Sequence, residues 1–481
     1  MAPPRPAAPV SSAGVVATLA LAGTVAAIMQ TLVTPLIAEL PKILDTSPSN
    51  SSWVITATLL SAAVFTPVSG RLGDLLGKRR MLLACCVPLI LGSVVCALSS
   101  SVVPMIAGRG MQGMGMGLLP IGISLLRDVL PAEKLSSAIA LVSASMGIGG
   151  GLGLPISAAV AEYTSWRVLF WGSAVLAVLI ALMIAKFVPN TPGGAAGQRF
   201  DFVGAVGLGT GLICMLLAVS KGADWGWTSG TTLGLFAATA VVLPVWGWWE
   251  LRGTEPLVDL RTTARPRVLL TNVASVLVGF GMYAQMLVLP QIYQLPEATG
   301  YGLGQSMLGM GLWMAPAGLI MMVISPLGGK LTTRSGPKVT LVVGALVIAA
   351  GYAVALPLMG STWGLLLTSL VCSTGVGFAY GAMPALVMSS VPLSETAAAN
   401  SFNTLMRSLG TSFSAAVVGV VLAEMSTTMG GHALPSENGF RVALLIGSGV
   451  ALLAAAVAAV IPAAPGAETV AKDAERVPAR A

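Results

Sequence analysis

The chain has 481 residues, of which 55% are hydrophobic and only 9% are charged, and its mean hydropathy is +0.88. This composition excludes an ordinary soluble domain and predicts an all-α polytopic membrane protein. The net charge is +7, with one histidine and five cysteines and no CxxC spacing, so we expect no nucleic-acid partner, no disulfide framework and no metal site. The excess of cations is instead what the cytoplasmic loops of a multi-pass protein carry.

Apolar segments long enough to cross a bilayer recur along the whole chain. We predict fourteen transmembrane helices, an even number that places both termini on one side. They cover approximately residues 14–38, 51–70, 81–99, 102–126, 135–160, 168–188, 202–220, 232–250, 268–290, 305–328, 339–358, 363–388, 398–424 and 440–462.

The distribution of Lys and Arg sets the orientation of these spans. With cytoplasmic termini, 19 of the 25 cations lie in cytoplasmic segments, four lie in outer loops, and two, Arg109 and Arg407, lie within spans. The positive-inside rule therefore predicts a multi-pass protein of the cell membrane with both termini in the cytoplasm.

The turn between the second and third spans, residues 70–80, reads GRLGDLLGKRR and holds five charges and three glycines. The glycines allow two helix ends to approach closely. The single acid, Asp74, can pair with Arg71 or Arg127 and accept backbone N–H bonds, which would hold the cytoplasmic face closed, or it can simply balance the surrounding cations. We predict a cytoplasmic gate made of Gly70, Arg71, Asp74, Gly77, Arg79 and Arg127.

The chain repeats this pattern 259 residues later. A Pro-x-x-Gly-cation-Leu run followed by another glycine begins at Pro67 and again at Pro326, but Thr333 stands in the place of Asp74. Two halves of parallel topology are typical of secondary transporters. The predicted organisation is a cytoplasmic tail at 1–13, a six-helix half at 14–188, a linker with two extra transmembrane helices at 189–267, a second six-helix half at 268–462 and a cytoplasmic tail at 463–481.

Three motifs carry a family resemblance. The turn at 70–80, the run RGMQGMGMG at 109–117 in the fourth span and Trp166-Arg167-x-x-Phe170 resemble signatures of the major facilitator superfamily. The extra helix pair is similar to that of the fourteen-helix drug:proton antiporters. The resemblance implies the major facilitator fold, no enzymatic activity, no cofactor, and function as a monomer that exports hydrophobic or cationic drugs or antibiotics by alternating access, driven by the proton gradient.

Other functions stay open at this point. The chain could export an endogenous metabolite or siderophore, or import a nutrient by symport. A passive channel or a non-transporting membrane sensor would be a different class, which the two-half repeat disfavours. The sequence contains no GxxxxGK[ST] loop, so ATP is not the expected energy source.

Ionisable residues inside spans are the candidates for proton coupling. Arg109 should face the cavity and find a partner there, because a charge within the bilayer is costly, and the resemblance implies a role in coupling. Met29 stands where members of the family often have an intramembrane Asp. We therefore expect Glu162 to carry the proton, with Glu424 as a second candidate, although both could be solvated interfacial residues.

Polar residues within spans define the expected substrate cavity. Its predicted lining is Gln30, Thr34, Gln112, Tyr283, Asn403 and Arg407. The fifth span is rich in glycine and contains a proline, which predicts a kinked helix that packs closely on its neighbours through Gly147, Gly151 and Pro155.

Overall fold

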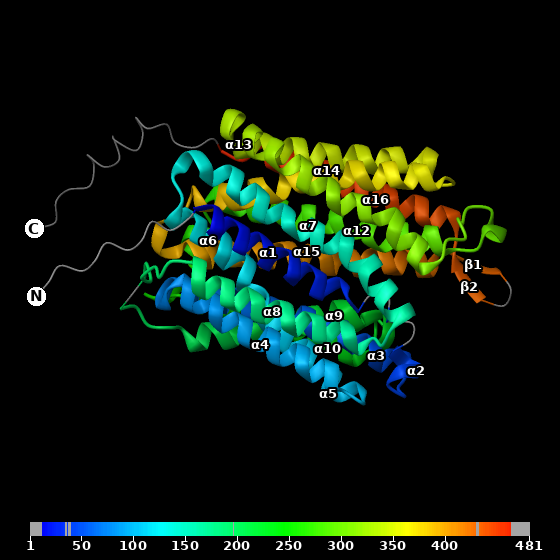
Figure 1. Cartoon of the computed structure of the whole chain (residues 1–481), viewed down its shortest axis with the longest axis horizontal. Helices are drawn as coiled ribbons and strands as arrows, with labels where there is room; N and C mark the ends of the chain where they lie inside the picture. The colour runs from blue at the N-terminus through cyan, green and yellow to red at the C-terminus, as the bar shows by residue number, and fades with distance from the viewer. Residues whose placement is uncertain (1–11, 34–35, 37–39, 196, 430–431, 463–481) are drawn as a thin grey trace, which may run out of the picture.

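A computed structural model describes residues 12–33, 36, 40–195, 197–429 and 432–462. Long helices lie side by side along one axis, and one short hairpin lies at one end of the bundle (Figure 1). The first half comprises α1 (Ser12–Thr31), α2 (Leu40–Ile43), α3 (Pro48–Leu76), α4 (Lys78–Leu98), α5 (Val102–Met114), η2 (Gly115–Gly117), α6 (Leu118–Val129), α7 (Ala132–Tyr163) and α8 (Arg167–Phe187).

An insert of three helices follows, and then the second half. The insert consists of α9 (Phe202–Trp225), α10 (Gly230–Arg252) and the short α11 (Leu260–Thr263). The second half comprises α12 (Pro266–Gln294), η3 (Glu297–Thr299), α13 (Met307–Leu358), α14 (Thr362–Met388), η4 (Leu393–Glu395), α15 (Thr396–Glu424), the antiparallel strands β1 (Ser426–Met429) and β2 (His432–Pro435), and α16 (Glu437–Ala459).

Among the described residues, twelve helices are long and apolar enough to cross a membrane. One of them, α13, has 52 residues, about 78 Å of helix, and is divided by Gly336, whose φ of 85° and ψ of 158° are not helical. In contrast, α5, η2 and α6 form one nearly continuous segment of which no part alone is long enough. Counting α13 as two segments and α5–α6 as one would make fourteen, so the predicted number of crossings stays a prediction.

The α3–α4 turn marks what we call the basic end of the bundle. Lys78 and Arg79 of this turn contact the ends of α6 and α8, and the β1–β2 hairpin lies at the opposite end (Figure 1). The predicted first span, 14–38, extends past the end of α1 at Thr31, and its last part includes residues outside the described ones.

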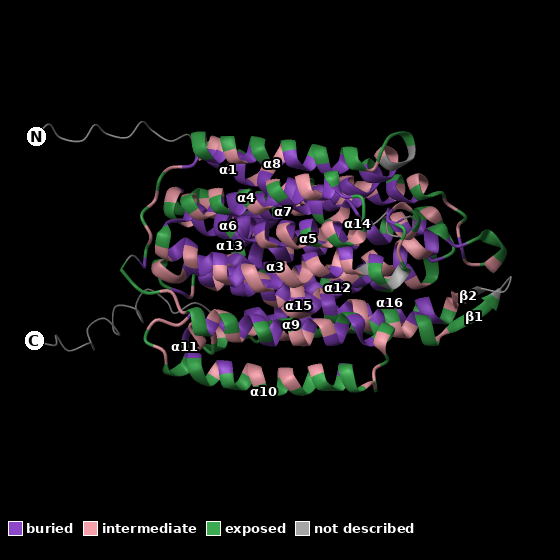
Figure 2. Cartoon of the chain, turned by 90° about the horizontal axis from the view of Figure 1, so that it is seen from below, coloured by how far each residue is buried: buried purple, intermediate pink, exposed green. Residues whose placement is uncertain are grey.

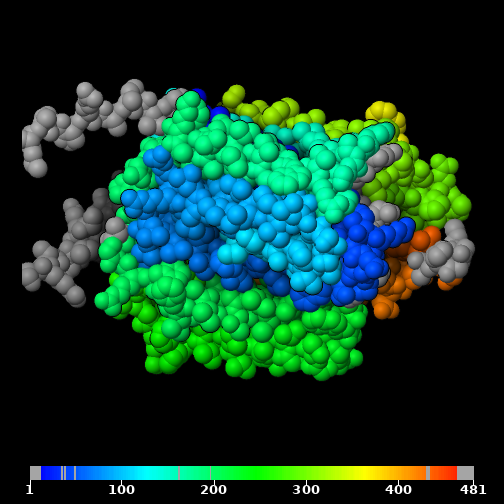
Figure 3. Space-filling view, turned by 60° about the horizontal axis from the view of Figure 1, so that its bottom comes forward, coloured from blue at the N-terminus to red at the C-terminus, as the bar shows by residue number. Residues whose placement is uncertain are grey.

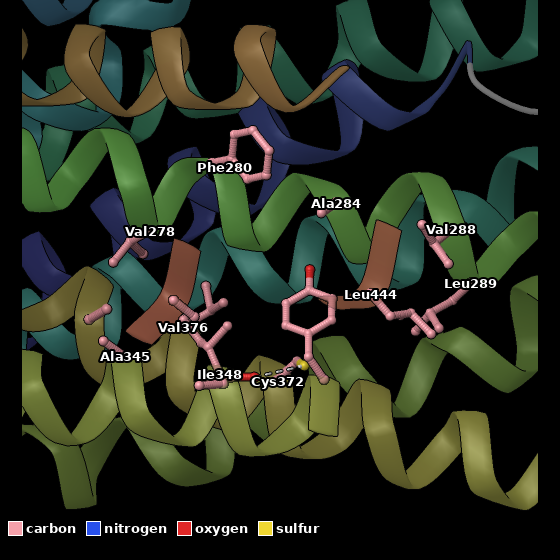
Figure 4. Packing of buried hydrophobic residues seen from close by; sticks show 14 of the residues in the cluster. Val278, Phe280, Ala284, Val288, Leu289, Ala345, Ile348, Cys372, Val376 and Leu444 are labelled. Carbon is pink, nitrogen blue, oxygen red and sulfur yellow. Dashed lines mark hydrogen bonds between the residues drawn. The ribbon is translucent and has the colours of Figure 1, made fainter. Parts of the chain in front are cut away.

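Each half has its own apolar core. In the second half, side chains from α12, α13, α14 and α16 interdigitate around Val278, Ile348, Val376 and Leu444 (Figure 4). In the first half, α1, α4, α6, α7 and α8 surround a corresponding cluster that includes Leu82. The insert lies at the periphery: Figure 2 shows α10 as the outermost helix, with much of its surface exposed, and Figure 3 shows the insert, in green, along one edge of the molecule.

The two most extensive helix crossings between the halves are α3 with α15 and α7 with α13. The repeat is visible at both crossings, because a Cβ atom added to Gly70 would lie 2.6 Å from Cβ of Ser401, and one added to Gly329 would lie 2.9 Å from Cα of Ser137. Glycine at these two equivalent positions lets the halves approach to backbone contact.

Candidate functional site

The N-terminus of α15 is capped by a residue from the other half of the molecule. Most long helices of the second half start at a serine whose hydroxyl accepts a backbone N–H bond, but Glu395, at the N-cap of α15, makes no such bond. Instead, the carboxylate of Asp74 accepts bonds from the backbone N–H groups of Ala397, at 3.1 Å, and Ala398, at 2.8 Å. These groups lack partners within their own helix, and the positive end of the helix dipole favours the carboxylate.

Asp74 is only 1% exposed, so this cap is shielded from water. A Cβ on Gly70, one turn earlier on α3, would lie 2.7 Å from the carbonyl oxygen of Ala397. We call Gly70, Asp74, Ala397, Ala398 and Ser401 the α3–α15 gate. Its two sides belong to different halves, so these contacts join the halves at the basic end of the bundle.

The turn itself is built on Gly77. Its φ of 99° lies in a region that favours glycine, and a Cβ there would lie 2.7 Å from the carbonyl oxygen of Thr191. The backbone N–H of Ala195 donates to the carbonyl oxygen of Asp74 at 3.0 Å. The segment after α8 therefore packs across the turn and supports it.

The arginines of the predicted gate have other partners than Asp74, which corrects that part of the prediction. Arg71 Nη2 donates to Gln198 Oε1 at 2.8 Å. Arg127 Nη1 donates to the carbonyl oxygen of Val391 and to the hydroxyl of Thr396, both at 3.1 Å, so it forms a second link between the halves beside the α3–α15 gate. Arg79 Nη2 donates to the carbonyl oxygen of Ala185, within the first half.

The repeat in the second half lacks a carboxylate. Thr333, the counterpart of Asp74, donates its hydroxyl proton to the carbonyl oxygen of Gly329 in its own helix, at 2.9 Å. Of the two equivalent crossings, the α3–α15 crossing thus has the carboxylate cap.

Arg109 lies in the interior of the first half and is 1% exposed. Its Nε donates to the carbonyl oxygen of Val54 at 3.2 Å, and its Nη1 donates to the carbonyl oxygen of Met29 at 2.8 Å and to Gln112 Oε1 at 2.7 Å. Gln112 Nε2 in turn donates to Ser93 Oγ at 2.8 Å. The guanidinium therefore joins α1, α3 and α5 through neutral oxygen acceptors.

The structure shows the positions of the two predicted proton carriers and of the predicted cavity residues in the first span. Glu162 lies in the last turn of α7, but its side chain is outside the described residues, as is the whole of Thr34. Glu424 is exposed at the end of α15. Gln30 is exposed, and its Nε2 lies 3.4 Å from the sulfur of Met116.

Two of the predicted cavity residues are turned into the protein interior. Gln112 and Asn403 have no exposed surface, so they do not line an open cavity in this conformation. Asn403 Nδ2 donates to Asn272 Oδ1 at 2.9 Å and to Ser275 Oγ at 2.7 Å, which joins α15 to α12. The reason is that the NH₂ group of each amide finds an acceptor on a neighbouring helix of its own half, and an unpaired donor in this environment would be costly.

Arg407 and Tyr283 complete the predicted cavity lining. The guanidinium carbon of Arg407 lies 4.3 Å above the ring of Tyr380, a cation–π contact, and Arg407 is 6% exposed. The Tyr380 hydroxyl lies 2.7 Å from the sulfur of Met282. Tyr283 is half-buried on α12.

The predicted packing residues of α7 lie at its crossing with α13. Gly147 packs against Met321, a Cβ on Gly151 would lie 2.6 Å from Cα of Gly318, and one on Gly311 would lie 3.1 Å from Cα of Pro155. The second crossing between the halves thus extends over several turns.

A polar pocket at the basic end was not predicted. It has a volume of about 110 Å³, and its lining includes Arg71, Gln198, Glu250, Asn272 and Glu395. Glu250, at the end of α10, is 2% exposed and accepts a bond from Trp246 Nε1 at 2.9 Å. An acid in a tryptophan-rich helix end is the signal in the sequence that could have indicated it. Among the described residues, no cluster of side chains suited to a metal ion is found.

Comparison with known proteins places this geometry in a family. The family model described as "Major Facilitator Superfamily" matches residues 19–415. The chain therefore belongs to this superfamily. An uncharacterized MFS-type transporter of Mycobacterium tuberculosis is 28% identical over 421 residues, which cover 86% of this chain and 60% of that protein. The chain therefore spans about 60% of the length of that relative.

Other relatives have names that describe export. The multidrug resistance protein Stp of Mycobacterium tuberculosis is 27% identical over 384 residues, covering 79% of this chain and 70% of Stp. The tetracenomycin C resistance and export protein of Streptomyces glaucescens is 28% identical over 397 residues, again covering 79% and 70%.

Solved structures support the fold. The human organic anion transporter MFSD10 superposes with a TM-score of 0.65 at 16% identity, covering 93% of this chain and 99% of that one. The proton:xylose symporter XylE superposes with a TM-score of 0.64 at 15% identity, covering 94% and 96%. The chain thus has the major facilitator fold, with twelve helices among its described residues that are long and apolar enough to cross a membrane.

Proposed function

We propose that this transporter exports hydrophobic or cationic drug-like molecules, antibiotics among them, by alternating access, and that an inward flow of protons drives the export. The observation that carries the proposal is the α3–α15 gate, where the carboxylate of Asp74 caps a helix of the opposite half and closes the basic end. With the cytoplasmic termini that the charge distribution predicts, this conformation would open toward the outside, and loss of the cap would expose the cavity to the cytoplasm.

The names of relatives support the choice of substrate and direction. Stp is named for multidrug resistance, and the protein of Streptomyces glaucescens is named for tetracenomycin C resistance and export. In this proposal Arg109 and Glu162 take part in proton coupling, no cofactor is needed, and the monomer is the functional unit. Arg109 is suited to such a role because its partners are neutral oxygens, so its charge is free to respond to a carboxylate that changes protonation.

Accumulation of an ethidium-like cation and of candidate antibiotics tests the proposal. It should be measured in cells with and without the protein, each with and without a protonophore. We expect lower accumulation with the protein and loss of this difference when the proton gradient collapses. Equal accumulation across a broad panel would refute drug export, and export that persists undiminished without the gradient would refute proton coupling.

A further inference from the structure

The insert is bonded to the first half at the basic end. Gln198, in the segment before α9, accepts the bond from Arg71 of α3, and Ala195 of the same segment donates to the carbonyl oxygen of Asp74. Arg71 is 4% exposed and Gln198 is exposed, so their bond is only partly shielded from water.

Two further contacts fix α9 to α3. Near the opposite end, Lys221 pairs with Asp224 at 3.0 Å, its Nζ lies 5.2 Å from the ring centroid of Trp53 on α3, and the rings of Trp53 and Trp225 are 6.4 Å apart. In the middle of α9, a Cβ added to Gly209 would lie 3.1 Å from Cγ1 of Val64, so the two helices touch closely there. The α9 helix is thus attached to α3 along its whole length by contacts that depend on direction or close fit.

The contact of α9 with the second half is apolar. Phe402, Leu405 and Leu409 of α15 form one cluster with side chains of α9, including Leu212. Ala63 of α3 belongs to the same cluster, so the α3 surface differs by the additional contacts named above. Apolar contacts have no directional preference, and within a bilayer lipid tails can replace them at little cost because the tails are as apolar as leucine.

We propose that α9 and α10 move with the first half during transport, and that the surface between α9 and α15 separates in every cycle while the surface between α9 and α3 stays intact. In the closed state α9 then covers the α3–α15 crossing on its lipid side. This inference rests on the alternating access of the proposed function, but it assigns to the insert a role of its own: a cover for the crossing that opens.

Paired cysteines test which surface separates. In a variant in which the five native cysteines are replaced, one pair is Val64→Cys with Gly209→Cys, which joins α9 to α3. The other pairs combine Leu212→Cys with Leu405→Cys or Leu409→Cys and join α9 to α15. Oxidation of the first pair should leave transport within about twofold of the reduced protein, whereas oxidation of the second should reduce it at least about tenfold, with recovery after reduction.

Three results would overturn the inference. The first is that the α3–α9 disulfide blocks transport. The second is that transport is unchanged when an α9–α15 disulfide has formed. The third is that no α9–α15 disulfide forms in the closed state. A readout without transport separates this inference from the proposed function. Asp74→Asn, which weakens the gate, should lower the yield of α9–α15 disulfide several-fold and leave the α3–α9 yield unchanged, whatever the substrate. An α9–α15 yield that Asp74→Asn leaves unchanged would also overturn the inference, even if drug export is observed.

Discussion

The substitution Asp74→Asn tests the gate most directly, because it removes the charge and keeps the size of the side chain. The carboxylate accepts two backbone bonds, and hydrogen bonds to a charged group contribute about 1.5–3 kcal/mol each. An asparagine keeps one accepting oxygen but turns an NH₂ group toward the second donor. We therefore expect the closed state to lose at least about 2 kcal/mol relative to the open state, roughly a 30-fold shift in their ratio.

A cysteine at position 401 can report this shift. Ser401 is fully buried against Gly70 in the closed state, so Ser401→Cys should react with a maleimide only when α3 and α15 separate. In inverted membrane vesicles, its labelling should be about 10- to 30-fold faster with Asp74→Asn than without it, since the rate follows the open population. Transport should slow while the amount of inserted protein stays normal.

The repeat supplies a matched control. Thr333→Asn places the same side chain at the equivalent position of the second half, where the native hydroxyl bonds only to its own helix. It should leave labelling at position 401 unchanged. The reasoning would be refuted if Asp74→Asn left the labelling rate unchanged in normally inserted protein, or if it blocked insertion instead of transport.

Three further predictions concern the interior. Gly151→Leu should disrupt the α7–α13 crossing and lower the protein's thermal stability in detergent. Gly172→Leu, where an added Cβ atom meets nothing within 4 Å, should have little effect; equal melting temperatures would contradict this. Arg109→Lys should reduce transport at least about tenfold, because a single ammonium cannot reproduce the fork geometry of a guanidinium that bonds three acceptors. As a control, Arg441→Lys at an exposed position should not change transport. A fully active Arg109→Lys would show that the mechanism does not need the guanidinium. Tyr380→Leu should lower the stability by about 1–2 kcal/mol in thermal unfolding, because it removes the cation–π contact with Arg407. Tyr380→Phe keeps an aromatic ring and should retain most of that stability. Similar losses in both variants would exclude the contact as the cause.

The sequence was sufficient to predict most of the spans and the repeat and to single out Asp74, because periodic glycines and a lone acid among cations are local patterns. The groups that donate hydrogen bonds to Asp74 were not predictable. The partners of Asp74 are backbone groups at positions 397 and 398, and a backbone N–H leaves no residue-type signal in the sequence.

The direction of side chains within a span was equally hidden. Gln112 lies three residues after Arg109, so the two side chains lie on one helix face. Because Arg109 donates to Gln112 in the protein interior, both side chains point inward. A polar residue in a span indicates that a partner exists but does not say whether that partner is a substrate or a neighbouring helix. Asn403 shows the same limit, since its amide NH₂ group donates to Asn272 and Ser275 of a neighbouring helix.

The unequal crossings have a mechanical consequence. Along α7 and α13 the backbones touch from Gly329 and Ser137 near the basic end to Gly311 and Pro155 further along, and the position equivalent to Asp74 holds Thr333, which bonds to its own helix. The two halves should therefore rotate relative to each other about the α7–α13 crossing, which acts as a hinge. The largest displacement should occur at the α3–α15 crossing. Spin-label distances across the α3–α15 crossing should broaden on opening far more than those across α7–α13, and a symmetric change at both would show that the hinge does not exist.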